Sequence, residues 1–424
     1  MKLQSIMIKN FKGIKDISVN FKASFNILIG INGVGKTSIL EAISVGLGGF
    51  LAGINEINTK HINQDEVRLE SKLTGDGSIN IKQEYPVKVE CTAILDDDQE
   101  FTWVRQKKNF KGRTTVEPRE ICKVSKEMMD DTEEILPLLN YQSAARMWAQ
   151  KREKTTNVFR ENFTRSVGYI DCLAEKSNAK MLLNWCKRME EISWQEDKKI
   201  SEYEAVKDAI VTFMSIMCER RVKGVRFHKR TGQLVYNLNE NENIPIHLLS
   251  SGYQSIIWMV MDIAYRMAVL NPNLRTEVTK RTPGIVLIDE LDLHLHPKWQ
   301  WQIIEALKTT FPCIQFITTT HSPLIIASAK NEQLISIGND MEIEYSSSAY
   351  GQQVGQVLSY LQDSYDRAKA VKDKFDGFYE AIGGERFTEA ENILNELVTE
   401  LNANNPDIVK AKTTLDLETA ILGD

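Results

Sequence analysis

A glycine-rich segment near the N-terminus has the residue types and the spacing of a phosphate-binding loop. Residues 30–37 read GINGVGKT, which fits the pattern G-x-x-x-x-G-K-[ST], and the apolar residues 25–29 come directly before them. Glycine lets the backbone turn its N–H groups toward an anion, and the start of the following helix favours negative charge. A lysine adds a point charge, and a threonine hydroxyl can ligate Mg²⁺. The segment therefore predicts a site for ATP or GTP with Mg²⁺, formed by Asn32, Gly33, Val34, Gly35, Lys36, Thr37 and Ser38.

An acidic pair follows an apolar run in the second half of the chain. Residues 285–288 read IVLI, and Asp289 and Glu290 come next. Four consecutive apolar residues predict a strand that is buried on both faces. An acidic pair at a strand end is common, but in a chain with a phosphate-binding loop it predicts hydrolysis. We expect Asp289 to hold Mg²⁺ and Glu290 to orient the attacking water or accept its proton.

Two further segments have the chemistry to contact a phosphate. Residues 249–254 read LSSGYQ and precede a helical run, so that hydroxyls and backbone N–H groups there could bind an anion. An ordinary helix cap by Ser250 or Ser251 would explain the same pattern. Residues 313–320 predict a strand that ends at His321, at the sheet edge where α/β folds bind their ligands. His321 could reach a γ-phosphate or serve as a structural hydrogen-bond partner.

The order of these segments resembles that of an ABC-type ATPase: P-loop, Leu-Ser-x-Gly signature, Walker B pair and switch histidine. Residues 8–13 (IKNFKG), 287–297 (LIDELDLHLHP) and 319–323 (TTHSP) resemble the RecF/SMC-like branch. The resemblance implies an α/β fold, with an ATPase head of mixed sheet and flanking helices, a short helical insertion and a C-terminal helical tail. It also implies a head-to-tail dimer that sandwiches two ATP molecules. The γ-phosphate bound to Lys36 of one subunit would also contact the signature of the other subunit, which contains Ser250, Ser251 and Gly252.

The resemblance implies roles for residues outside the four motifs. Gln142, after a predicted strand at 137–141, is our candidate for the glutamine that contacts Mg²⁺, with Arg146 as a candidate phosphate contact. Asp292 falls in the segment that crosses the dimer interface. We expect the pair His294 and His296 in that interface turn rather than at a metal ion. Transporter ATPases carry a glutamine at the signature position that Tyr253 occupies here. The contacts of that glutamine are therefore not expected in this chain.

Composition limits the remaining possibilities. The chain has 424 residues, of which 42% are hydrophobic and 26% charged, as in a soluble globular protein with two or three domain-sized cores. No apolar stretch is long enough to span a bilayer and the N-terminus does not read as a signal peptide, so we expect a cytoplasmic protein without a membrane partner. Six cysteines without a C-x-x-C pair predict free thiols.

Hydrophobic periodicity divides the chain into four expected parts. Residues 1–150 form the N-terminal ATPase lobe, with strands at 3–8, 17–21, 25–29, 85–95 and 100–105. Residues 151–222 form a helical insertion, with core contacts from Trp185, Met189 and Trp194. Residues 223–363 form the C-terminal ATPase lobe, which begins with a strand pair and contains the signature, the Walker B pair and His321. Residues 364–424 form a tail of two or three helices, either for oligomer or partner contact or as a cap on the core.

The spacing of the motifs indicates a branch without an effector domain. Only 211 residues separate Thr37 from Leu249, too few for the long coiled coil of cohesin-like ATPases. The 103 residues after His321 lack the acidic constellation of a Toprim nuclease, so we expect no intrinsic nuclease. Residues 250–255, 283–297 and 311–316 are similar to the PtuA ATPase family of the Septu anti-phage system. That similarity implies an ATPase, with hydrolysis that could be slow, which gates or scaffolds an HNH endonuclease and forms higher oligomers.

A RecF-like ATPase that clamps DNA in repair or chromosome maintenance is the alternative. This alternative predicts a basic path across the dimer, although basic loops are ordinarily just solvated surface. A net charge of −6 leaves room for such a local path. The candidates for it are Arg105, Lys107, Lys108, Lys111, Arg113, Arg220, Arg221, Lys223 and Arg226.

Overall fold

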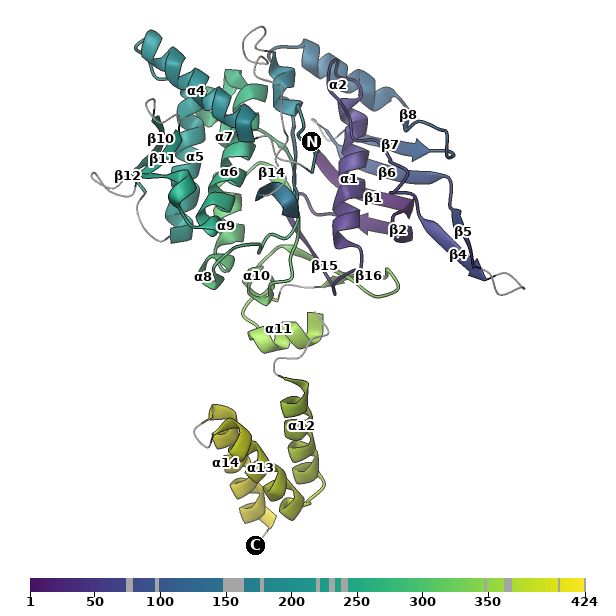
Figure 1. Cartoon of the computed structure of the whole chain (residues 1–424), viewed down its shortest axis with the longest axis vertical. Helices are drawn as coiled ribbons and strands as arrows, with labels where there is room; N and C mark the ends of the chain where they lie inside the picture. The colour runs from purple at the N-terminus through teal and green to yellow at the C-terminus, as the bar shows by residue number, and fades with distance from the viewer. Residues whose placement is uncertain are drawn as a thin grey trace. The chain divides into compact units, whose positions relative to one another are not determined.

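The structure is a computed structural model that describes most of the chain (Figure 1). The described residues are 1–73, 79–95, 99–147, 164–175, 179–218, 222–228, 233–237, 243–346, 349–361, 368–402 and 405–422. They divide into two compact units, Met1–Gln352 and Gln353–Asp424. Within the described residues, none of the helices combines the length and the apolar character that a bilayer span needs.

A six-stranded mixed sheet forms the centre of the first unit, in the order β16-β15-β3-β14-β13-β9. All neighbours in it are parallel except β15 and β16. The strands β3, β13 and β14 consist mostly of apolar residues and threonine and are buried along their whole length. The bounds of the six strands are β3 Phe25–Ile29, β9 Leu138–Gln142, β13 Gly284–Ile288, β14 Ile314–Thr319, β15 Gln333–Ile337 and β16 Ile343–Ser346.

Helix α1 (Lys36–Leu51) lies between this sheet and a second, antiparallel sheet, and it contacts strands of both. Two glycines allow this close packing. A Cβ atom on Gly46 would lie 2.3 Å from the Cys91 sulfur, and one on Gly49 would lie 2.4 Å from the Trp103 ring nitrogen. The second sheet has the order β2-β1-β6-β7-β8, with bounds β1 Lys2–Phe11, β2 Ile14–Asn20, β6 Val87–Ile94, β7 Glu100–Lys107 and β8 Thr115–Glu117.

Smaller elements surround these layers. Helix α2 packs on α1, and the hairpin β4–β5 forms a sheet of its own. The strands β10, β11 and β12 form a small antiparallel sheet before the signature segment. The bounds of these elements are β4 Leu69–Leu73, β5 Ile79–Gln83, α2 Glu120–Asp130, β10 Gly224–His228, β11 Gln233–Asn237 and β12 Asn243–Pro245.

A helical layer around α5 and α6 contains the predicted insertion. The ring of Trp185 packs edge-on against Tyr203 and Tyr265, with centroids 5.7 and 5.1 Å apart, and Met189 is buried nearby. The prediction for Trp194 was wrong, because its side chain is 74% exposed. Besides α1 and α2, the α-helices in the described part of this unit are α4 Ala179–Gln195, α5 Ser201–Cys218, α6 Ser251–Leu270, α7 Val278–Arg281, α8 Pro297–Gln300, α9 Ile303–Thr310 and α10 Pro323–Ser328.

The second unit is helical and has its own apolar core, centred on Phe378 and Leu397. The tail prediction of two or three helices is confirmed, with a turn after Gly383 and a break before Pro406. Its helices are α11 Val354–Leu361, α12 Lys369–Gly383, α13 Phe387–Leu401 and α14 Pro406–Leu422.

Candidate nucleotide-binding site

The predicted phosphate loop connects the C-terminal end of β3 to the first residue of α1. Gly33 and Gly35 have φ angles of 82° and 100°, which favour glycine because a Cβ atom would be strained there. The Lys36 ammonium is buried and donates to the carbonyl oxygens of Gly30 (2.8 Å) and Ile31 (2.9 Å). Burial lowers the pKa of Lys36, while Asp289, Asp292 and Glu290 oppose that shift. The loop therefore keeps one buried cation at the start of a helix, as phosphate binding requires.

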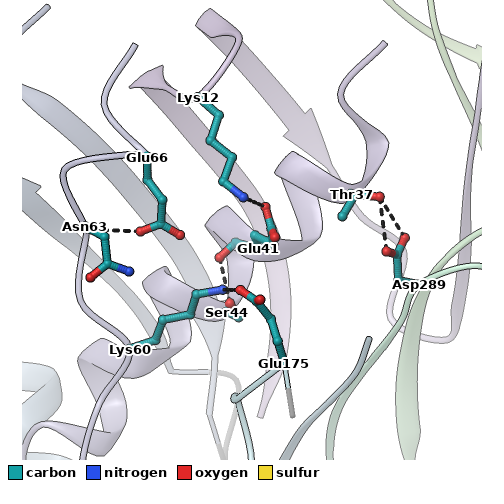
Figure 2. A network of polar contacts seen from close by, with 9 residues as sticks. All are labelled: Lys12, Thr37, Glu41, Ser44, Lys60, Asn63, Glu66, Glu175 and Asp289. Atoms are coloured by element: carbon teal, nitrogen blue, oxygen red, sulfur yellow. Dashed lines mark hydrogen bonds and ion pairs between the residues drawn. The ribbon is translucent and has the colours of Figure 1, made fainter. Parts of the chain in front are cut away.

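Asp289 at the end of β13 lies directly across from this loop (Figure 2). The Thr37 hydroxyl lies 3.1 Å from both carboxylate oxygens of Asp289. The hydroxyl of Thr319, at the end of β14, donates to Asp289 Oδ1 at 2.6 Å. Asp289 is only 3% exposed, so its carboxylate depends on these hydroxyls in a site of low dielectric. A hydroxyl and a carboxylate at this spacing fit the oxygen ligands that Mg²⁺ prefers beside a nucleotide.

Glu290 and His321 follow two neighbouring strands of the central sheet. The backbone N–H of Glu290 donates to the Thr319 hydroxyl (2.8 Å), and the residue adopts a positive φ of 50°. The backbone N–H of His321 and the Thr320 hydroxyl both donate to Asp292 Oδ1. Burial, and then the charge of Lys36, lowers the pKa of His321. Asp292, which we placed at a dimer interface, thus also holds the histidine segment within its own chain.

The signature segment forms the start of α6. Ser250 occupies the N-cap position, but its side chain makes no capping hydrogen bond, and Ser250 and Ser251 are both exposed. An ordinary side-chain cap therefore does not explain these serines. Gly252 packs against the turn that contains His294, since a Cβ atom on Gly252 would lie 2.6 Å from the carbonyl oxygen of His294. The ring of Tyr253 packs edge-on against Trp299 at 4.5 Å, which gives this residue a structural role.

Gln142 ends β9, next to Asp289. The backbone N–H of Asp289 donates to the Gln142 carbonyl oxygen at 2.9 Å. The buried Gln142 amide donates to Asn140 Oδ1 (2.7 Å) and to Asp262 Oδ2 (2.8 Å). Sequence reasoning did not find Asp262, because one acidic residue within a helix gives no signal. Arg146 falls in a short 3₁₀ helix, and its side chain lies outside the described part of the chain.

His294 and His296 lie in the segment between β13 and α8. His294 adopts a φ of 64°, and the ring of His296 accepts a bond from the backbone of Lys298 at 3.3 Å. Among the described residues, no group of three or more His, Cys, Asp and Glu could hold a metal ion.

The motif at residues 8–13 supports the site from outside. Lys12 forms an ion pair with Glu41, which is buried on α1 (Figure 2). The backbone N–H of Lys12 donates to the Glu66 carbonyl oxygen at 2.7 Å. Lys60, in the segment that follows α1, pairs with Glu175 at 3.1 Å. The Lys12–Glu41 pair thus ties α1 to the turn between β1 and β2, and the Lys60–Glu175 pair ties the segment after α1 to the segment after β9.

The basic residues proposed for DNA contact fall into three groups. Arg105 and Lys107 were wrongly assigned to the surface. Both are buried, and they donate to the carbonyl oxygens of Lys60 (2.6 Å) and Ile62 (3.2 Å). Arg220 and Arg221 lie outside the described residues. The remaining candidates are exposed: Lys108, Lys111, Arg113, Lys223 and Arg226.

Comparisons with known proteins find family models and relatives that are similar to this chain. A family model described as AAA domain matches residues 5–215, and one described as AAA domain, putative AbiEii toxin, Type IV TA system matches residues 219–327. The retron Vc95 probable ATPase of Vibrio cholerae serotype O1 biovar El Tor is 26% identical over 86% of this chain and 79% of its own length. The Septu protein PtuA of Bacillus mycoides (strain KBAB4) is 27% identical over 89% of this chain, which spans only 47% of that protein.

A solved structure supports the fold. The SmcHead bound to the C-winged helix domain of ScpA aligns with a TM-score of 0.51 and 16% identity, over 82% of this chain and 98% of that one. The predicted mixed sheet with flanking helices is thereby confirmed as an ABC-type ATPase head, and the head fold implies nucleotide binding. The chain thus has an SMC-type head fold and is similar to the Septu PtuA proteins and to retron ATPases.

Proposed function

We propose that this chain is the ATP-binding and ATP-hydrolysing subunit of an anti-phage defence complex that gates or scaffolds a partner HNH endonuclease. ATP with Mg²⁺ would close a head-to-tail dimer through Lys36 of one subunit and Ser250 of the other. Hydrolysis, or loss of nucleotide, would open the dimer and change the geometry offered to the nuclease. The dimers would associate further into a larger oligomer.

One observation carries this proposal: a full set of ATPase motifs occurs in a chain whose described residues hold no metal cluster for nucleolytic chemistry. The similarity to Septu PtuA and retron ATPases supports a defence role. An effector on a second polypeptide would account for both facts. Dimerisation has its own support, because the serines of the signature are exposed and make no capping bond.

The second unit, Gln353–Asp424, is the best candidate for the partner or oligomer surface. It has an apolar core of its own, so it can fold into a separate binding surface. It contains 14 acidic and 7 basic residues, a charge that repels a phosphate backbone and favours a protein partner. We therefore assign protein contact, rather than DNA contact, to this unit.

Affinity purification from the native host tests the proposal. Glu290→Gln should hold the ATP-bound state, and Lys36→Ala, which should not bind nucleotide, is the matched control. We expect Glu290→Gln to retain a small HNH protein encoded next to this chain in stoichiometric amount, and Lys36→Ala to abolish phage protection. Recovery of repair or replication factors alone, or full protection by Lys36→Ala, would overturn the proposal.

A DNA-clamping ATPase of the RecF type is the second candidate function. The exposed loop after β7 favours it, since Lys108, Lys111 and Arg113 accompany Phe110, which is 61% exposed. A clamp of this kind predicts DNA binding that weakens steeply with salt and is lost when the three cations become alanine. Lys107→Ala is not a valid control, because that lysine is buried. Lys123→Ala serves instead, because Lys123 is an exposed lysine on α2.

A further inference from the structure

One carboxylate on the signature helix collects hydrogen bonds from three other residues. Asp262 lies on α6, and its Oδ2 atom accepts from Asn140 Nδ2 (2.8 Å) and from Gln142 Nε2 (2.8 Å). The guanidinium of Arg266, one helical turn later, donates to both oxygens of Asp262 at 3.1 and 3.2 Å. Apart from Gln142, the residues of this cluster lie outside the motifs that we assigned to ATP hydrolysis.

The cluster is rigid because each member is buried or doubly bonded. Asn140 and Gln142 are 1% and 6% exposed, and Arg266 is 3% exposed. Arg266 also donates to the carbonyl oxygens of Gly168 (2.8 Å) and Ile170 (2.9 Å). The guanidinium thus has protein acceptors on two sides and holds the Asp262 carboxylate in one place.

This arrangement decides which atom of the Gln142 amide is available. The Nε2 atom donates to Asn140 Oδ1 at 2.7 Å as well as to Asp262, so both of its hydrogens have acceptors. The carbonyl oxygen Oε1 is the only remaining polar atom of that side chain. A carboxylate can only accept, so Asp262 excludes the flipped amide, which would place Oε1 against a negative oxygen.

We propose that Asp262 is a positioning residue that fixes the Gln142 amide with Oε1 free for Mg²⁺ and couples that amide to the signature. The coupling follows from the helix, because Gly252 and Asp262 lie ten residues apart on α6, about 15 Å along one rigid axis. A shift of α6 when the signature engages the partner's nucleotide carries Asp262 and the Gln142 amide with it. This inference rests on the proposed function for the dimer and for the Mg²⁺ role of Gln142.

Binding of a fluorescent ATP analogue to the full-length protein, measured as a function of Mg²⁺ concentration, tests the positioning. The variants are Asp262→Asn, Gln142→Ala and the double substitution, with Asp208→Asn on an exposed part of α5 as the matched control. Asp262→Asn and Gln142→Ala should each raise the Mg²⁺ concentration for half-maximal binding by about tenfold, because losing a hydrogen-bond partner of a metal ligand costs ~10–100-fold in affinity. Binding in EDTA should not change.

The double variant separates positioning from a merely structural role. If Asp262 acts through Gln142, the double substitution is no worse than Gln142→Ala alone. Effects that multiply in the double variant, or an unchanged Mg²⁺ dependence in Asp262→Asn, would overturn the inference. Where Asp262→Asn fails to fold because Arg266 loses its partner, Asn140→Ala replaces it, since it frees the same amide and leaves the ion pair intact.

Self-association measured by light scattering tests the coupling. ATP with Mg²⁺ should dimerise the wild-type chain, and Asp262→Asn should need about tenfold more Mg²⁺ to do so. Dimerisation of Asp262→Asn at the Mg²⁺ concentration that suffices for the wild-type chain would contradict the coupling. A wild-type chain that never dimerises would refute the proposed function instead, while the binding experiment would still judge the positioning of Gln142.

Discussion

The hydroxyl of Thr37 lies 3.1 Å from both carboxylate oxygens of Asp289, although 252 positions separate the two residues. Thr37→Ala should therefore raise the Mg²⁺ concentration that ATP hydrolysis requires by at least tenfold. Loss of even an outer hydrogen-bond partner of a metal ligand lowers metal affinity by ~10–100-fold. Thr37→Ser keeps the hydroxyl and is the control. Hydrolysis rates over a Mg²⁺ titration provide the measurement, and an unchanged requirement in Thr37→Ala would contradict this assignment.

Two adjacent buried threonines on β14 differ in their roles. The Thr319 hydroxyl connects Asp289 (2.6 Å) to the backbone N–H of Glu290 (2.8 Å), whereas the Thr318 hydroxyl makes one long bond of 3.3 Å to Asn26. Thr319→Val leaves a backbone N–H without its acceptor, so we expect a loss of about 1–3 kcal/mol in unfolding free energy and much slower ATP hydrolysis. Thr318→Val, the control, should change neither by much. If Thr318→Val and Thr319→Val lost the same unfolding free energy in urea and slowed ATP hydrolysis equally, the two threonines would not differ in their roles.

Gly252 has no room for a side chain. Its Cβ atom would lie 2.6 Å from the carbonyl oxygen of His294, so Gly252→Ala must displace the signature or the interface turn. ATP-dependent dimerisation should then weaken at least tenfold, while nucleotide binding by the monomer stays intact. Gly224→Ala is the matched control, because no atom lies within 4 Å of a Cβ there. Sedimentation with ATP measures both variants, and wild-type dimerisation by Gly252→Ala would exclude a packed signature.

The imidazole of His321 should titrate below the usual 6.5. Burial is the larger cause of the lowered pKa and the positive charge of Lys36 is the second, so the ring is neutral at pH 7. Lys36→Ala removes one cause and should raise the pKa of His321. NMR titration of the histidine rings measures this, with the chain's five other histidines as internal references. A pKa of His321 that does not move in Lys36→Ala would show that the two groups are electrostatically independent.

The second unit should unfold without the first. Phe378 is fully buried in its core, whereas the neighbouring Tyr379 on the same helix is 41% exposed. Phe378→Ala should cost about 3–5 kcal/mol in that unit and leave ATP binding unchanged, and Tyr379→Ala should cost far less. Calorimetry resolves the two transitions. Loss of ATP binding in Phe378→Ala would show that the nucleotide site depends on this unit.

Several strands were predictable because their apolar residues follow a strand pattern. The apolar run at 285–288 lies in β13, and the strand pair predicted at the start of the C-terminal lobe is β10 and β11. Two errors came from periodicity that was present in the sequence but not applied. Arg105 alternates in phase with Trp103 on a strand, so it faces inward, and Trp194 lies nine residues after Trp185, on the opposite side of a helix.

The remaining part of the candidate site was not predictable from local pattern. Asp262 contacts Asn140 and Gln142 from 122 and 120 positions away, and only the packing of α6 against β9 creates that contact. A helix of apolar residues with one aspartate looks the same whether that aspartate faces solvent or a strand. Tertiary contact of this kind is set by the assembled layers, so sequence spacing within α6 could not reveal it.

The position of β3 in the central sheet has a consequence for the newly made protein. Both of its neighbours, β14 and β15, come from residues 314–337, whereas β3 is the first strand of this sheet to be translated. The strand that leads into the phosphate loop therefore has no partner in the sheet until about three quarters of the chain has been made. We expect a nascent fragment that ends before β14 to lack the sheet that positions the phosphate loop.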